Sequence, residues 1–135
     1  MNQDFFEKLI IGLASAIISG AIAVFISTWI YKKNELRKAK LDVFRKLMGF
    51  RYDIYSKEFA EALNSIFVIF YKSDEVIVAL KNFHDATIST HKETSKVEAK
   101  LLELFKAISN DLGINVGAFS DNFFLMPFQS KRSVN

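Results

Sequence analysis

The longest apolar run in the chain extends from Leu9 to Ile30, where 22 consecutive residues carry no charge. An α-helix rises about 1.5 Å per residue, so this run reaches roughly 33 Å, enough to cross a hydrocarbon core of about 30 Å. A cleavable signal peptide fits poorly, because the run is long, the preceding residues are net acidic and no small-residue cleavage site follows. A buried helix of a soluble protein seldom continues this far without a polar edge. The sequence therefore predicts a transmembrane helix over residues 9–31, after a short extracytoplasmic segment, residues 1–8.

Basic side chains gather directly after the apolar run. Residues 32–46 hold seven Lys or Arg against two acidic residues, whereas residues 1–31 and 47–135 each carry a net charge of −1. By the positive-inside rule the basic stretch is cytoplasmic and the N-terminus lies outside. We expect its side chains also to contact anionic lipid headgroups, which fits better than nucleic acid because no aromatic stacking platform accompanies them. These predicted topology and lipid residues are Lys32, Lys33, Arg37, Lys38 and Lys40.

Small residues recur along one face of the apolar run, which lets a second helix approach closely. They are Gly12, Ala16, Gly20, Ala23 and Ser27. Small residues are also common in transmembrane helices that do not associate. The pattern predicts a homo-oligomer assembled through this face, with a lone helix as the alternative.

The polar and apolar positions after residue 31 predict a small cytoplasmic helical domain over residues 32–128. With one proline and five glycines in the whole chain, long helices are expected. The transmembrane helix is expected to continue without a break to about Gly49. A second helix is expected to begin after Ser56 as N-cap and to end near Tyr71, at the centre of the domain. Its predicted apolar set is Phe59, Leu63, Ile66, Phe67 and Phe70.

Two further helices complete the predicted bundle. Ser73 opens a third helix, and Ser95 with Glu98 forms an S-x-x-E capping box for a fourth. That fourth helix has the clearest amphipathic pattern, and Gly113 is its expected C-cap. The inward positions are Ile77, Leu80 and Phe83 in the third helix, and Val97, Leu101, Leu104, Phe105, Ile108 and Leu112 in the fourth. The fold class is all-α, with about four helices.

The C-terminal part of the domain loses helical periodicity after Gly113. Its aromatic stretch, AFSDNFFLMPF, predicts a short helix or extended arm that packs over the bundle. An exposed arm that docks a partner is the alternative. Residues 129–135 are expected to form a flexible tail.

Candidate chemistry is sparse. The absence of cysteine excludes disulfides and thiolate chemistry, and His84 and His91 lack a metal-ligand spacing. Arg45, Arg51 and Asn64 lie among apolar neighbours, and polar groups in a core need partners. A structural polar network is predicted for these three, with a ligand site as the alternative. We therefore expect no enzyme, no cofactor and no metal.

The chain also resembles a family of uncharacterised bacterial and phage proteins. The residues that carry the resemblance are VFRKLMGFR (43–51), EALNSIFVIFY (61–71), the LG at 112–113 and the following FFLMP. Members have an N-terminal transmembrane helix and a helical domain with FRxLMxxR and ALNxI blocks. These blocks correspond here to Phe44, Arg45, Leu47, Met48 and Arg51, and to Ala62, Leu63, Asn64 and Ile66. Members often have a proline after the serine that opens the second helix, where this chain has Lys57. The resemblance covers about residues 36–128 and implies fold and topology but no activity.

The predicted function is a single-pass, membrane-anchored helical interaction and oligomerisation module of the bacterial inner membrane, in phage–host conflict or envelope regulation. Its expected partners are membrane lipids, further copies of itself and an unidentified cytoplasmic protein, but not nucleic acid. The alternative is a pore-type effector that perturbs the membrane after assembly through the transmembrane helix.

Overall fold

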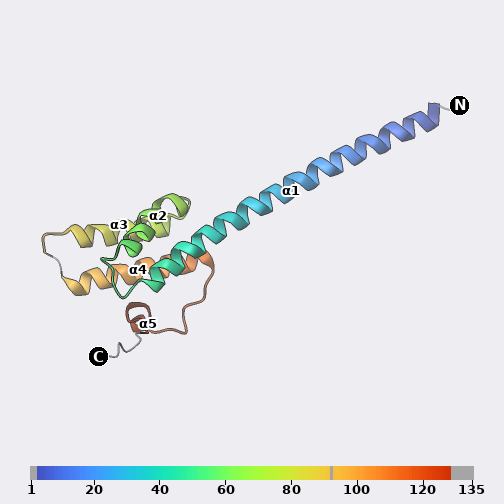
Figure 1. The fold of residues 1–135 in the computed structure, drawn as a ribbon. Coiled ribbons are helices and arrows are strands. Elements are labelled where there is room, and N and C mark those ends of the chain that lie inside the picture. Colours follow the sequence, from blue (N-terminus) through green and yellow to red (C-terminus); the bar gives the residue numbers. More distant parts are fainter. Residues whose placement is uncertain (1–2, 92, 129–135) are drawn as a thin grey trace, which may run out of the picture. The chain divides into compact units, whose positions relative to one another are not determined.

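Helices account for every regular element in the computed structural model, which describes residues 3–91 and 93–128 (Figure 1). The helices are α1 (Gln3–Gly49), α2 (Lys57–Ile69), α3 (Asp74–Ile88), α4 (Thr94–Leu112) and α5 (Asp121–Leu125). The predicted all-α class and the unbroken helix to Gly49 are confirmed. Residues up to Leu36 form one compact unit, and those from Arg37 onward form a second.

The first unit consists of α1 up to Leu36, and each of its described side chains is exposed. Its large apolar residues are between 37% (Leu36) and 74% (Phe25) exposed. Within the described part of the chain, α1 is the one helix long and apolar enough to cross a membrane. The helical part of the transmembrane prediction is thus confirmed.

The core of the second unit is built around α4. Its buried positions include all six that the sequence predicted, and the longest consecutive run of buried residues is Ala107, Ile108 and Ser109. α3 packs along α4 in the opposite direction (Figure 1), since Glu75 near the start of α3 accepts a 3.2 Å hydrogen bond from Asn110 near the end of α4. The last turns of α1, α2 with its C-cap residue Phe70, and Phe124 of α5 contribute the rest. The core residues are Val43, Leu47, Phe59, Ala62, Ile66, Phe70, Val76, Ala79, Phe83, Ala86, Val97, Leu101, Leu104, Phe105, Ala107, Ile108, Leu112 and Phe124.

The central position predicted for α2 is wrong. Phe67 and Val68 are each about two-thirds exposed, whereas α4 is buried on most of its circumference. α2 buries Phe59, Ala62 and Ile66 and ends at Ile69, two residues before the predicted boundary near Tyr71. The side of α2 that faces away from the core therefore exposes apolar side chains.

Helix starts follow the predicted serines in two cases and depart from them in the third. Ser56 caps α2, because its hydroxyl accepts the Phe59 N–H at 3.2 Å, and Ser73 is the N-cap residue of α3 without a side-chain hydrogen bond. The capping box in α4 is wrong: the Glu93 carbonyl already accepts the Lys96 and Val97 N–H groups, so the helix begins at Thr94. Ser95 consequently lies inside the first turn, where it cannot act as an N-cap.

The predicted C-terminal arm contains the short helix α5 and packs on the bundle. Phe124 is 2% exposed within the core, and α5 contacts α4. Phe119 and Phe128 at either side of α5 remain exposed. The aromatic stretch is therefore a packed segment with exposed ends, and the predicted tail, residues 129–135, lies outside the described residues.

Candidate functional site

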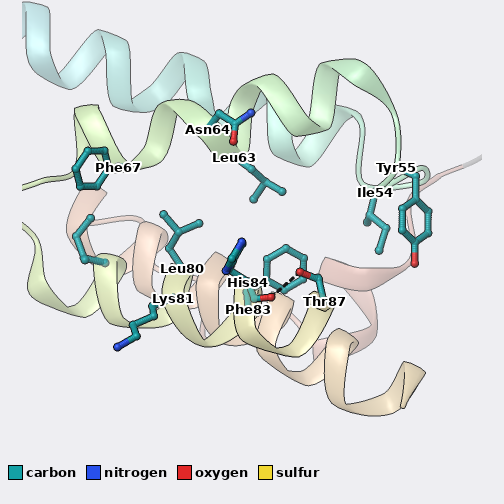
Figure 2. Close-up of a pocket in the computed structure, with 11 residues that line it drawn as sticks. Ile54, Tyr55, Leu63, Asn64, Phe67, Leu80, Lys81, Phe83, His84 and Thr87 are labelled. Carbon is teal, nitrogen blue, oxygen red and sulfur yellow. Dashed lines mark hydrogen bonds between the residues drawn. The ribbon is translucent and has the colours of Figure 1, made fainter. Parts of the chain in front are cut away.

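An apolar groove lies between α2 and α3. Its volume is about 640 Å³, and the lining residues are Ile54, Tyr55, Leu63, Asn64, Phe67, Ile77, Leu80, Lys81, Phe83, His84 and Thr87. We call this feature the α2–α3 groove. Figure 2 shows Leu63 of α2 directed toward Leu80 and His84 of α3, whereas the side chain of Lys81 points away from α2. The volume falls within the range of about 300–1,000 Å³ typical of small-molecule sites.

The groove arises from the two faces of α3. Val76, Ala79, Phe83 and Ala86 are buried, at the spacing that keeps one helical face against the core. Residues one position further along point about 100° away, so Ile77, Leu80 and His84 face α2 instead. Leu63 and Leu80 are only half-buried, because α2 turns its own buried face to the core. The apolar walls of the groove thus lack a covering element among the described residues.

The polar groups of the groove are few and none is acidic. Thr87 is satisfied locally, since its hydroxyl donates a 2.7 Å hydrogen bond to the His84 carbonyl (Figure 2). His84 Nδ1 lies 3.8 Å from the Asp85 carboxylate, which is outside the groove. Lys81 forms no hydrogen bond or ion pair with any described residue. The single formal charge on the groove lining is therefore the positive charge of Lys81.

A second cationic site lies at the C-terminus of α4. Arg37 Nη1 donates a 3.0 Å hydrogen bond to the Leu112 carbonyl, and Lys40 Nζ lies 2.6 Å from Asp111 Oδ2. Gly113 ends the helix with φ +69°, and the Ile114 N–H returns to the Ser109 carbonyl at 2.9 Å. The predicted C-cap is confirmed. Positive side chains at the negative end of a helix dipole stabilise it.

This placement changes the interpretation of the basic stretch. Two of the five predicted lipid-contact residues, Arg37 and Lys40, bind the end of α4. Lys32, Lys33 and Lys38 are exposed, and the Lys33 ammonium lies 5.4 Å from the ring centroid of Trp29. Lipid contact by these side chains stays a prediction.

The predicted packing face on α1 is fully accessible. Gly12, Ala16, Gly20, Ala23 and Ser27 are exposed, and an added Cβ at either glycine would meet no atom within 4 Å. The described residues thus leave room for another helix along this face. Self-association itself stays a prediction.

The three polar side chains expected to share a network are separate. Arg45 is exposed and lies 3.5 Å from Asp42, one turn earlier on the same helix, whereas Asn64 lines the α2–α3 groove. Arg51 donates to the Met48 carbonyl, and its guanidinium carbon lies 6.0 Å from the ring of Phe123. The prediction was wrong because two of the three positions are exposed and so need no buried partner.

Arg51 is the most enclosed of the three. Its Nε is buried and has no hydrogen-bond partner among the described residues, and desolvation lowers the pKa of its guanidinium. Two carboxylates near it in the sequence are engaged elsewhere. Asp53 Oδ1 accepts the Tyr55 N–H, and Glu61 pairs with Lys46 at 2.9 Å. Lys46 lowers the pKa of the Glu61 carboxyl through this hydrogen bond and through its charge.

The two histidines do not share a helix. His84 belongs to α3, which ends at Ile88, so His91 lies beyond it. Across residues 3–91 and 93–128, no group of three or more ligating side chains could hold a metal ion. His84 instead contributes to the wall of the α2–α3 groove.

Comparison with known proteins identifies a family but no activity. The sequence matches a family of unknown function, DUF6680, over residues 3–120. The predicted resemblance to an uncharacterised family is confirmed, and the match begins earlier than expected, within α1. No curated protein and no solved structure matches the chain.

Proposed function

For this chain, which belongs to the DUF6680 family of unknown function, we propose the role of a membrane-anchored helical interaction module. The supporting observation is the exposure of the whole apolar run of α1, while residues from Arg37 onward bury a core of their own. An exposed helical surface of 22 uncharged residues is stable in a bilayer and unfavourable in water. The second unit accordingly does not require this part of α1 for its core.

The proposed location is the bacterial inner membrane, crossed once, with the N-terminus outside and the helical domain in the cytoplasm. The charge asymmetry around residues 9–31 supports this orientation. The exposed Lys32 and Lys33 would then lie at the level of anionic headgroups. Phage–host conflict and envelope regulation are the settings we propose for such a module.

Anchoring and orientation can be tested together, because the chain contains no cysteine. A single cysteine is introduced either as Gln3→Cys or as Lys96→Cys, both at exposed positions. The proposal expects both variants to sediment with membranes and to resist carbonate extraction. A membrane-impermeant maleimide should label Gln3→Cys in intact spheroplasts and Lys96→Cys only after lysis. Recovery of the protein in the soluble fraction contradicts anchoring, and the reverse labelling pattern contradicts the orientation.

Self-association through the small-residue face is the second part of the proposal. Gly12→Ile with Gly20→Ile places branched side chains on this face and should abolish cross-linked oligomers in membranes. Ala14→Ile with Ala21→Ile adds nearly the same bulk, one methyl group less at each position, on the opposite face and is the matched control. If both double variants cross-link like the unmodified chain, the small-residue face is not the interface.

The alternative, a pore-type effector, uses the same open face of α1. It predicts loss of membrane potential when the chain is expressed, and recovery in the Gly12→Ile, Gly20→Ile variant. An oligomer that leaves the potential unchanged favours the interaction module and excludes the pore.

A further inference from the structure

Arg37 follows the predicted span closely in the chain and contacts the end of α4. We propose that Arg37 also binds the phosphate of an anionic lipid headgroup, so that one guanidinium joins the membrane surface to the C-terminus of α4. The inference rests on the proposed membrane anchoring. It adds a form of regulation to it, because the charge of the lipids then controls how firmly the end of α4 is held.

The guanidinium of Arg37 has donors that α4 does not use. Its Nη1 donates a 3.0 Å hydrogen bond to the Leu112 carbonyl, yet the residue is exposed. A guanidinium carries five N–H groups in a fixed planar fork, and this geometry matches two oxygens of a phosphate. No carboxylate among the described residues forms an ion pair with Arg37. The bond to Leu112 therefore leaves further N–H groups for an anion.

The position of Arg37 along α1 places it near lipid phosphates. Arg37 is six residues after Tyr31, the last residue of the predicted span, which corresponds to about 9 Å of helix. Side chains on a helix lean toward its N-terminus, and long basic side chains extend to the membrane interface. The headgroup layer adds about 5–8 Å beyond the hydrocarbon core. The Arg37 side chain can therefore reach this layer.

Lys40 does not share this position. It lies roughly 14 Å after Tyr31 along α1, and its ammonium is 2.6 Å from Asp111 Oδ2. With 17% of its side chain exposed, Lys40 is closed to a headgroup. Its charge also neutralises Asp111, the acidic residue next to Leu112, so no unpaired carboxylate at this position repels an anion. The negative end of the α4 dipole faces Arg37 itself, whose positive charge lies between the carbonyl and the phosphate.

The contact with α4 prepares Arg37 for the lipid. Holding a free arginine side chain in one geometry costs rotamer entropy. The hydrogen bond to Leu112 already restricts these rotamers, so the phosphate meets a preorganised group. By thermodynamic linkage, a lipid that binds the restricted side chain better stabilises the end of α4 by the same factor. A basic side chain near an anionic surface gains about fivefold in binding, which sets the upper limit of this effect.

Hydrogen exchange of the full-length chain in lipid nanodiscs tests this coupling. Nanodiscs of phosphatidylcholine are compared with nanodiscs in which part of this lipid is replaced by phosphatidylglycerol. The anionic lipid should slow exchange in the peptide 101–112 by roughly two- to fivefold. The α2 peptide 57–66 corrects for the altered pH at a charged surface, and the slowing is measured relative to it.

Two variants separate Arg37 from the general attraction of basic residues to the membrane. Arg37→Gln should abolish the lipid effect on the peptide 101–112. Lys32→Gln removes the same charge from an exposed position closer to the span and is the matched control, so it should keep the effect. Each variant is compared with itself in the two kinds of nanodisc, so a change in its basal stability cancels.

The remaining arms identify the source of the phosphate and the sign of the coupling. Inorganic phosphate added to phosphatidylcholine nanodiscs should leave the exchange unchanged; an effect equal to that of phosphatidylglycerol assigns the site to a soluble anion and overturns the lipid proposal. Faster exchange with phosphatidylglycerol means that lipid draws Arg37 away from Leu112, and it overturns the bridge. An unchanged rate, or an effect that Arg37→Gln retains, overturns it as well. A chain that does not insert into the nanodiscs contradicts the anchoring itself.

Discussion

Removal of the carboxylate at the end of α4 should loosen that helix by a measurable amount. Lys40 Nζ and Asp111 Oδ2 are 2.6 Å apart, and both side chains are 17% exposed. Exposed ion pairs contribute about 0.2–1 kcal/mol, whereas loss of one partner from a fully buried pair costs about 3–5 kcal/mol. The intermediate burial suggests a cost of about 2 kcal/mol for Asp111→Asn.

One effect opposes this cost. Asp111 lies in the last turn of α4, where a negative side chain is unfavourable by about 0.5 kcal/mol against the helix dipole. The net loss is therefore about 1.5 kcal/mol, which corresponds to roughly tenfold faster opening. Lys40 also lies 5.1 Å from the ring centroid of Phe70, so it retains one favourable contact after the change.

Hydrogen exchange of the full-length chain in detergent micelles, followed by mass spectrometry, measures this opening in the peptide 101–112. Glu103→Gln on the same helix is the matched control, because its pair with Lys100 is more exposed and should change exchange by less than about threefold. A double variant with Lys40→Met should cost less than the sum of the two single changes. If Asp111→Asn exchanges no faster than Glu103→Gln, the ion pair does not stabilise α4 and the reasoning fails.

Three further changes test the core, the helix end and a surface pair. Phe105→Ala, at a fully buried position, should cost about 3–5 kcal/mol and make the bundle sensitive to limited proteolysis; a protease-resistant variant would contradict the core assignment. Gly113→Ala should cost about 1–2 kcal/mol by hydrogen exchange, because φ is +69° and no steric clash adds to it, while Gly49→Ala, also without a clash, should not destabilise. NMR titration should find the pKa of Glu61 below the ordinary carboxyl value, and Lys46→Met should raise it. Because the folded pKa is lowered, the stabilisation from this pair is present above the ordinary carboxyl pKa and is lost as pH falls through the lowered value.

The sequence was most informative where one periodicity dominated. The 22-residue uncharged run and the six inward positions of α4 could be predicted from helical spacing alone, and both segments are helical in the structure. Gly113 was identifiable because few residues tolerate a left-handed conformation. The start of α4 was missed because a backbone carbonyl at Glu93, rather than the Ser95 side chain, begins the hydrogen-bonding pattern.

The α2–α3 groove was harder to predict from the sequence than the helices. Phe67 looked like a core residue because α2 is apolar on most of its circumference, and periodicity cannot then decide which side faces the bundle. The α2–α3 groove depends on the packing of α3 against α4, which turns Leu80 and His84 toward α2. A signal was nevertheless present: α3 has a second apolar row, Ile77 and Leu80, beside its buried row. Arg37 and Lys40 gave no sign of contact with α4, because their partners lie more than 70 residues away in the chain.

The contacts of Arg37 and Lys40 imply an order of events in biosynthesis. In the proposed anchoring, topology is decided while the chain emerges, before α4 has been made, when all seven basic residues of 32–46 are available to keep their side of the chain in the cytoplasm. Once residues 94–112 fold, two of these charges move to the end of α4. Arg37 and Lys40 would then first help to keep this segment on one side of the membrane and later bind the C-terminal end of α4. Charge reversal at these two positions should therefore have two separate effects: misinsertion during synthesis and lower stability of the helical domain after folding.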